Sequence, residues 1–404
     1  MPAPSALHRL SPLALCAGAF WCLPAGAAST APAESLQPFA GIGWAHDDNL
    51  LRQADGAPAF GNGRSDSYRT VEAGLVLDKH ISRQRIAATA KVSKTAFDHF
   101  KQLDYIGHDL QAMWFWHIGT QFDGRLEMLD SRTLAPYTDF NSDQRNLRQQ
   151  RRQIIDAGWT LHPGWKLRAG AERDKASYDL AIQRFNTRTE KAFDTELLYQ
   201  SRGGSALGLV ARRVKGSYPY RRPAIGTVLT DDFTQDELKL RINWLATGST
   251  TVQGLAGYAR REQPSYGEGA TSGVNGRINA FYTPRGPLSY QAGMWREFAP
   301  VESPFVSYTL NRGASIGVNW AASARVALEA SATYERRTYT ARGDFTGAAA
   351  LRDAIRSASV RTVWQVRPGV KVVAAYVRQA RTASALGTGK FDANVVQVSA
   401  NVLF

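Results

Sequence analysis

The most informative absence in this sequence is of cysteine. The 404-residue chain has two cysteines, Cys16 and Cys22, both near its start. Disulfide frameworks, zinc–cysteine sites and cysteine nucleophiles are therefore excluded from the rest of the chain. Long apolar runs are also absent after the first 25 residues, and a composition of 44% hydrophobic and 21% charged residues is too polar for a bundle of transmembrane helices. Such a chain can cross a membrane only as β-strands.

A targeting signal is predicted over residues 1–27. His8 and Arg9 precede an apolar run, 10–23, and the small residues 25–27 form an A-x-A cleavage site. The run is shorter than the ~20 residues that cross a bilayer as a helix, which favours a secretory signal peptide over a membrane anchor. We expect cleavage after Ala27, export, and a single domain over residues 28–404.

Apolar and polar residues alternate with a period of two along the rest of the chain. In the last segment Val396, Val398, Ala400, Val402 and Phe404 alternate with mostly polar residues, as the lipid-facing and lumen-facing positions of a barrel strand do. A terminal aromatic residue on such a strand resembles the insertion signal of bacterial outer-membrane barrels. The pattern predicts eighteen strands, at about 36–46, 68–78, 84–93, 106–116, 120–129, 153–161, 165–173, 192–200, 205–213, 235–244, 250–260, 274–283, 287–296, 310–320, 324–335, 356–365, 370–378 and 393–404.

From the fourth predicted strand onward, an outward aromatic residue lies at or near the end of every second strand. The series is Trp116, Trp159, Tyr199, Trp244, Tyr282, Trp320, Trp364 and Phe404. A short turn follows each internal member of the series, and the long polar connections fall at the other strand ends. Outer-membrane barrels have short periplasmic turns, long external loops and aromatic girdles. We therefore predict an all-β, transmembrane antiparallel barrel with both termini in the periplasm, in preference to a soluble β-sandwich or propeller.

The inward-facing half of the alternation predicts a charged lumen wall. Acids such as Glu72 and Asp156 nearly balance its cations, so the formal charge of +14 does not indicate a uniformly basic pore. Opposed charges across the bore would orient a polar solute, or they would pair with one another and stabilise the wall. The lumen-lining candidates are Lys91, Arg125, Glu127, Lys166, Arg168, Arg212, Lys239, Arg241, Arg277, Arg361 and Lys371. Three of them, Lys239, Arg241 and Arg277, would form part of the track of an acidic polymer.

The predicted external loops carry an excess of positive charge. In the loop 214–234, Tyr218, Tyr220, Arg221 and Arg222 place aromatic faces beside cations. Sugar rings stack on such faces, so these four residues are candidates for carbohydrate binding. Phosphates of the outer-membrane lipid and lipopolysaccharide are the alternative partners of the loop cations.

The sequence gives little support for a catalytic site or a cofactor site. His108 and Asp109 occupy adjacent positions that face opposite ways, so they do not bring a nucleophile, a base and an orienting group together. The run 47–49 could bind a cation, although turn chemistry explains the same residues. We expect no enzyme activity, no cofactor, no metal site and no nucleic-acid partner.

Over its mature length the chain resembles the EpsL-type outer-membrane proteins of exosortase-associated exopolysaccharide operons, within a broader group of β-barrel porins. The resemblance rests on the run HDDNLLR at 46–52, on Leu103-Asp104-Tyr105 leading into Trp114-Phe115-Trp116, and on the strand at the C-terminus. It implies an outer-membrane conduit or assembly component for a secreted polysaccharide, with periplasmic export proteins as partners. It carries over no catalytic residue. The alternative left open by the residues is a general diffusion porin for small polar or anionic solutes.

Overall fold

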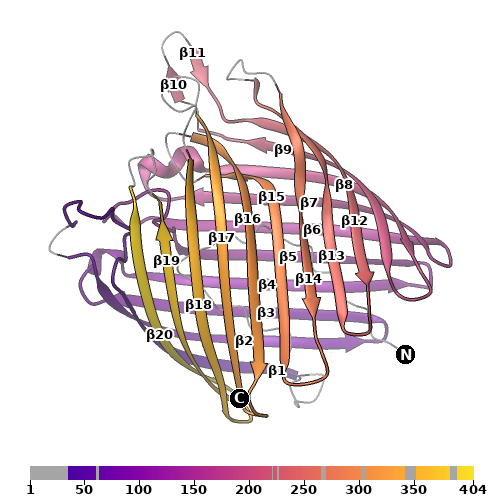
Figure 1. Ribbon diagram of the computed structural model, residues 1–404, viewed down its shortest axis with the longest axis horizontal. Helices are drawn as coiled ribbons and strands as arrows, with labels where there is room; N and C mark the ends of the chain where they lie inside the picture. Colours follow the sequence, from indigo (N-terminus) through magenta and orange to yellow (C-terminus); the bar gives the residue numbers. More distant parts are fainter. Residues whose placement is uncertain are drawn as a thin grey trace.

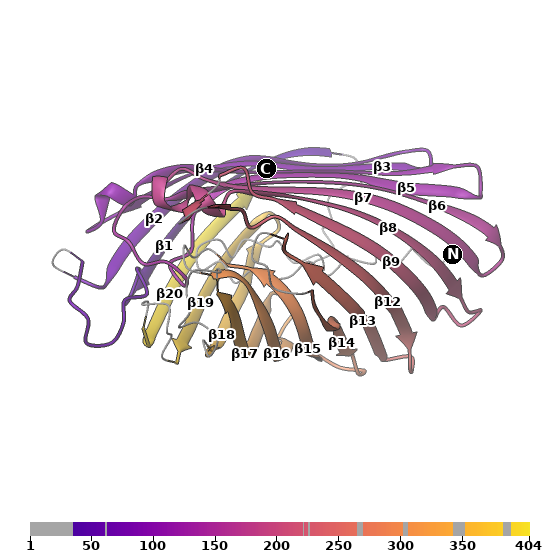
Figure 2. The same cartoon turned by 90° about the horizontal axis from the view of Figure 1, so that it is seen from above.

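The protein folds as a closed β-barrel (Figures 1 and 2). The computed structural model describes residues 35–60, 63–220, 222–224, 227–264, 270–301, 306–341, 352–382 and 389–404. The predicted signal peptide, residues 1–27, lies outside these ranges. In the sheet of eighteen strands each strand pairs antiparallel with the next, and β1 pairs with β20 to close the cylinder. The predicted all-β, antiparallel barrel of eighteen strands is confirmed.

The strands are long, and short turns at one end alternate with longer connections at the other. Their bounds are β1 Ser35–Asp47, β2 Asp66–Ile81, β3 Gln84–Phe97, β4 Tyr105–Ile118, β5 Phe122–Leu134, β6 Leu147–His162, β7 Trp165–Tyr178, β8 Arg188–Gln200, β9 Ala206–Ser217, β12 Phe233–Leu245, β13 Thr250–Glu262, β14 Thr271–Tyr282, β15 Leu288–Pro300, β16 Val306–Ala321, β17 Val326–Ala341, β18 Arg352–Arg367, β19 Val370–Arg381 and β20 Phe391–Leu403. The short strands β10 (Arg222–Ala224) and β11 (Thr227–Leu229) form a separate hairpin between β9 and β12. Two 3-10 helices, η1 (Lys101–Leu103) and η2 (Ala181–Asn186), lie in other connections.

All eighteen predicted strands are present, but many extend further than predicted. The extensions concentrate at the ends that carry the long connections, which we call the long-loop end. There β6 begins at Leu147 instead of 153, and β3 ends at Phe97 instead of 93. Backbone pairing continues past the apolar zone because only the part of a strand that faces hydrocarbon needs an apolar outer side. The β10–β11 hairpin was not predicted.

The outer surface is apolar, as the alternation predicts. On β12, Leu238 and Leu240 are 56% and 49% exposed, whereas the intervening Lys239 is 8% exposed and faces the interior. Trp159, Trp244, Trp320 and other members of the aromatic series are exposed beside the short turns. The exposed leucines and the buried lysine are opposite to the pattern of a water-soluble protein and match a barrel in lipid. No helix among the described residues is long and apolar enough to span a membrane.

Tight turns join the strands at the opposite, short-turn end. Pro163-Gly164 joins β6 to β7, and Pro368-Gly369 joins β18 to β19. Both glycines have positive φ, 89° at Gly164 and 79° at Gly369, a conformation that tight hairpin turns require and that costs glycine little. These turns leave the long-loop end as the place where the chain has length to fold over the bore.

Candidate functional site

The predicted lumen-lining residues lie on the inner wall, and nearly all of their cations are paired with carboxylates. The pairs are Lys91–Glu72 (3.8 Å), Arg125–Glu127 (3.2 Å), Arg125–Asp156 (3.1 Å), Arg168–Asp156 (3.0 Å), Arg212–Glu172 (3.0 Å), Lys239–Glu237 (2.9 Å), Arg241–Glu196 (2.5 Å), Arg277–Glu297 (2.8 Å), Arg361–Glu329 (3.1 Å) and Lys166–Asp123. The exception is Lys371, which is half-buried and has no ion pair with a described residue. The geometry therefore favours mutual pairing, one of the two alternatives that the sequence left open.

This pairing changes the charge that the wall presents to a solute. Lys239, Arg241 and Arg277 each have a carboxylate within 3 Å, and the Lys239 ammonium also donates to Asn275 Oδ1 at 3.0 Å. A cation beside a carboxylate presents a local dipole rather than a free charge. The wall is thus polar and close to neutral, and these three residues do not form an uninterrupted basic track.

The predicted carbohydrate-binding set is corrected at Tyr218. Its ring is buried with Ala192, Val214 and Phe233, and burial raises the pKa of the phenol to about 12. A buried ring cannot stack on a sugar in solution. The Tyr218 ring packs against its neighbours instead. Tyr220 is 46% exposed, Arg221 lies outside the described residues, and Arg222 is the first residue of β10.

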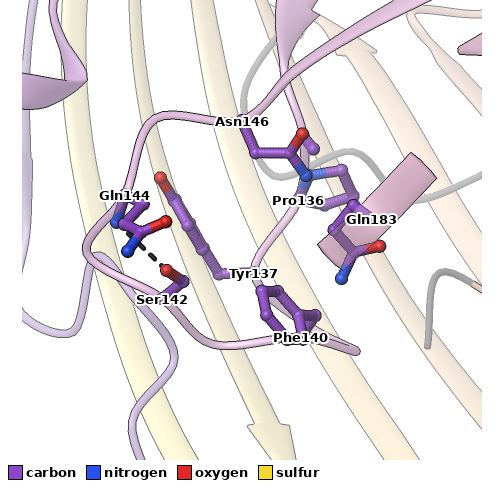
Figure 3. A pocket seen from close by; sticks show the side chains of 8 residues that line it. Pro136, Tyr137, Phe140, Ser142, Gln144, Asn146 and Gln183 are labelled. Atoms are coloured by element: carbon purple, nitrogen blue, oxygen red, sulfur yellow. Dashed lines mark hydrogen bonds between the residues drawn. The ribbon is translucent and has the colours of Figure 1, made fainter. Parts of the chain in front are cut away.

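A segment between β5 and β6 lies across the long-loop end of the bore. We call residues 135–146 the strap. Its Asp139 forms an ion pair with Arg337 of β17 at 2.9 Å, and its Thr138 carbonyl accepts a hydrogen bond from Arg381 of β19. Around the barrel, β19 lies six strands from β5, and β17 lies eight strands from β5. In a barrel of eighteen strands, the strand directly opposite β5 lies nine strands away. The strap therefore connects distant parts of the wall, as its course in front of the C-terminal strands shows (Figure 3).

The far end of the strap is held by a buried cluster that we call the latch, formed by Arg337, Tyr339, Asp353 and Arg381. Asp353 accepts hydrogen bonds from Arg337 (Nη2, 2.9 Å; Nε, 3.0 Å) and Tyr339 (2.7 Å), and it pairs with Arg381 at 2.6 Å. The side chains of Asp353 and Arg381 have no exposed surface. Two arginines against one wall carboxylate leave a positive excess, and Asp139 of the strap neutralises it.

The near end of the strap rests on an apolar cluster. Tyr137 packs with Leu51, Phe100 and Leu103, which come from the β1–β2 and β3–β4 connections, and burial raises the pKa of the Tyr137 phenol. The Asn141 amide donates to the carbonyls of Leu51 at 2.7 Å and of Arg52 at 2.5 Å. Three successive long connections thus form one layer over the mouth.

The motif at 46–52 belongs to this layer. The Arg52 guanidinium pairs with Asp47 at 2.8 Å and donates to Gln379 at 3.1 Å. The Asn49 backbone N–H donates to Asp47 Oδ1 at 3.0 Å, an Asx-type turn of the kind expected for such residues. Turn formation, rather than cation binding, is the role that this geometry gives to Asp47 and Asn49.

A small cavity separates the strap from η2. It is lined by Pro136, Tyr137, Asn146, Gln183 and neighbouring strap residues (Figure 3), and its volume of ≈ 10 Å³ has room for about one water molecule. The strap is therefore packed against η2 as well as against the wall. Within the part of the chain that the structure describes, no group of His, Cys, Asp or Glu could hold a metal ion.

The latch was not among the predicted site residues, although a signal for it was present. Arg337, Asp353 and Arg381 lie on the inward side of the alternation, but beyond or before the predicted limits 324–335, 356–365 and 370–378. Extending the alternation by a few residues places all three inside the mouth. The pairing of Asp139 with Arg337, 198 residues away, had no local signal.

Comparisons with known proteins show a likeness to solved structures alone. No protein-family model matches the chain, and no curated protein matches its sequence. Among solved structures it is similar to OccK2 (OpdF) of Pseudomonas aeruginosa, with 11% identity, 92% of this chain and 98% of that chain covered, and a TM-score of 0.50. It is also similar to the outer membrane protein OpdK of P. aeruginosa (11%, 92% and 99%, 0.49) and to a BenF-like porin of Pseudomonas fluorescens Pf-5 (10%, 92% and 99%, 0.48). The resemblance to EpsL-type proteins stays a prediction.

Proposed function

We propose that this protein is a passive outer-membrane channel for small polar solutes. The observation that carries the proposal is the strap, which is tied to opposite parts of the wall and narrows the mouth of an otherwise wide barrel. An eighteen-stranded barrel without such a segment would enclose a broad aqueous bore. The apolar outer band and the exposed aromatic residues support a location in the outer membrane, with the long-loop end outside.

The strap also bears on the alternative, export of a polysaccharide. A conduit for a polymer must let every unit of the polymer pass in turn, so a segment held across the mouth by an ion pair and hydrogen bonds obstructs it. A small solute needs only the remaining opening. The barrel fold that the chain shares with OccK2 fits this function, and we propose a transport role rather than an enzymatic one.

The wall gives the channel its expected ion preference. Its cations and carboxylates are paired side by side, so they orient polar groups without strongly favouring anions or cations. Lys371 adds one cation near the short-turn end. We expect a weak preference for anions and ready passage of neutral polar solutes.

The size limit for solutes that pass through the purified protein tests the proposal. In proteoliposome swelling assays with neutral sugars of increasing size, we expect permeation by monosaccharides and little by oligosaccharides. Asp139→Ala removes the ion pair that ties the strap to β17, so it should raise the size limit and the single-channel conductance. Asp143→Ala, in the same strap but with no ion pair to a described residue, is the matched control. Absence of conductance, or equal permeation by all sugars, would contradict the proposal.

A deletion strain separates the channel from polysaccharide export. If the proposal is right, loss of the gene leaves surface polysaccharide in place and slows uptake of a small polar solute. Loss of surface polysaccharide with unchanged solute uptake, restored by the intact gene, would instead support the conduit implied by the sequence resemblance.

A further inference from the structure

Three arginines form a row on the outer surface of β15, β16 and β17, strands that lie side by side in Figure 1. In the antiparallel register Arg296 faces Arg312, and Arg312 faces Arg336. Directly opposed residues share one face of the sheet, with Cβ atoms about 4.5–5.5 Å apart, and like charges in such positions repel. The alternation puts the row on the outer side, since Met294 and Ile316 on the same strands are 63% and 65% exposed.

The outer sides of these three strands carry no acidic residue to balance the row. Their glutamates occupy inward positions: Glu297 pairs with Arg277, Glu329 with Arg361, and Glu335 accepts from Trp295. Within the described ranges, none of the three arginines has an ion pair. Arg296 donates to the Val274 carbonyl, a neutral acceptor that leaves its charge unbalanced.

Some outward arginines elsewhere near the long-loop end have carboxylate partners. Arg151 pairs with Asp130 at 2.6 Å, Arg213 with Asp236 at 2.5 Å, and Arg378 with Asp392 at 2.6 Å. In each case the acid lies on the neighbouring strand, directly opposite or one step away along the outer face. Three other outward cations, Arg173, Lys191 and Lys215, also face one another across β7–β9 without an ion pair to a described residue. The row on β15–β17 differs from them because all three of its cations are arginines.

The height of the row in the membrane identifies the missing anion. Arg312 lies eight residues from Trp320 of the short-turn girdle, roughly 27 Å of strand at about 3.4 Å per residue, which a tilt of about 40° reduces to roughly 20 Å of height. This is close to the thickness of the apolar band of such barrels, about 25 Å. Tyr334, 40% exposed, adjoins the row on the lipid side. Lipid phosphates lie at this boundary.

Apolar neighbours raise the need for a counter-charge. Phe298 and Leu310 follow Arg296 and Arg312 on the outer face toward the long-loop end and face each other in the register. Arg296 and Arg312 therefore lie between apolar residues on the outer face, where Arg296 is half-buried and Arg312 is exposed. Guanidinium groups bind phosphate oxygens bidentately, with strong charge-assisted hydrogen bonds.

We propose that Arg296, Arg312 and Arg336 bind a phosphate group of the outer-leaflet glycolipid. Arg356 extends the site on β18, where its guanidinium lies 5.8 Å from the centre of the Tyr334 ring. The site rests on the outer-membrane location and orientation given above, but not on channel activity. It assigns a lipid contact to one side of the barrel wall.

The test compares a variant with Arg296, Arg312 and Arg336 changed to Gln with a control in which Arg151, Arg213 and Arg378 are changed to Gln. Both lose three outward cations, and folding is verified by the gel shift on boiling. The probe is lipid A bearing both phosphates, and the readouts are lipid retained through purification, by native mass spectrometry, and the rise in unfolding temperature on adding lipid A. We expect the row variant to retain lipid A roughly tenfold less than the wild type, or less still; a tenfold loss corresponds to about 1.4 kcal/mol of binding free energy. The control should retain nearly as much lipid A as the wild type.

Further arms identify the ligand. Dephosphorylated lipid A should not raise the unfolding temperature, and neither should inorganic phosphate at the same concentration. Equal binding of dephosphorylated lipid, an equal effect of free phosphate, or equal losses in both triple variants would overturn the proposal. If the row variant does not fold, Arg312→Gln is compared with Arg213→Gln by the same readouts. Single-channel conductance, measured in parallel, reports on the proposed function separately.

Discussion

The inner wall and the latch use the same ion pairs in different surroundings. On the wall, Arg361 and Glu329 are directly opposed on neighbouring strands, 3.1 Å apart, and their side chains remain 28% and 32% exposed. In the latch, the side chains of Arg381 and Asp353 have no exposed surface, and a third strand and a distant loop complete the cluster. Water can replace a lost partner at the Arg361–Glu329 pair but not in the latch. Burial therefore decides how much each pair matters.

The largest effect is expected from removing the central acid of the latch. Asp353→Ala leaves Arg337 and Arg381 buried without their shared carboxylate. Breaking a buried pair in this way costs about 3–5 kcal/mol, which should appear as a lower midpoint in urea unfolding from lipid vesicles. Glu329→Ala, which removes an acid from the partly exposed wall pair, is the matched control. Equal losses in the two variants would show that burial does not separate the two regions.

A smaller loss is expected when only the strap is released. Asp139→Ala removes one partner of Arg337, which keeps Asp353, so the free energy of unfolding should fall by about 1.5–3 kcal/mol, the usual effect of one hydrogen bond to a charged group. The strap should also become accessible to added protease, as followed by mass spectrometry of the fragments. A strap that stays resistant in this variant would mean that the Thr138 and Asn141 contacts hold it without the ion pair.

On the wall the expected effect is on selectivity more than on stability. Glu196→Gln removes the negative partner of Arg241 and leaves a free positive charge facing the bore. The reversal potential in a salt gradient should then shift toward anion preference. Thr195→Val, one residue away on the outer side of β8, is the control and should leave the potential unchanged. A shift toward cations would contradict the inward placement of this pair.

The smallest effect is expected at the exposed pair beside a short turn. Arg85 and Asp78 are 2.6 Å apart, with side chains 46% and 43% exposed. Asp78→Asn should change the free energy of unfolding by about 0.2–1 kcal/mol, the range of exposed ion pairs, and should leave conductance unaltered. A loss as large as that of Asp353→Ala would mean that exposure does not set the order of these effects.

The predicted strand limits are correct where the outer surface contacts lipid, and they are too short where it does not. On β12 the exposed Leu238, Leu240 and Ile242 carry the period of two that identifies the strand. At the start of β6 the outward Arg151 faces Asp130 instead of hydrocarbon, and the apolar signal that marks a strand is lost. The loop residue Tyr218 was misjudged for a related reason: an aromatic residue in a polar loop can be a ligand platform or a core residue, and only its neighbours decide between them.

The sequence by itself determined the eighteen strands of the barrel and the face of the residues within their apolar part, because a period of two is local and depends on nothing beyond the strand itself. Only the tertiary structure decided that the wall charges pair, that the strap lies over the mouth, and that three arginines meet on the outer surface. Each of these depends on partners brought together by barrel closure or register. The contact of Asp139 with Arg337 follows from neither residue's local sequence, since the closed wall and the folded strap place them together.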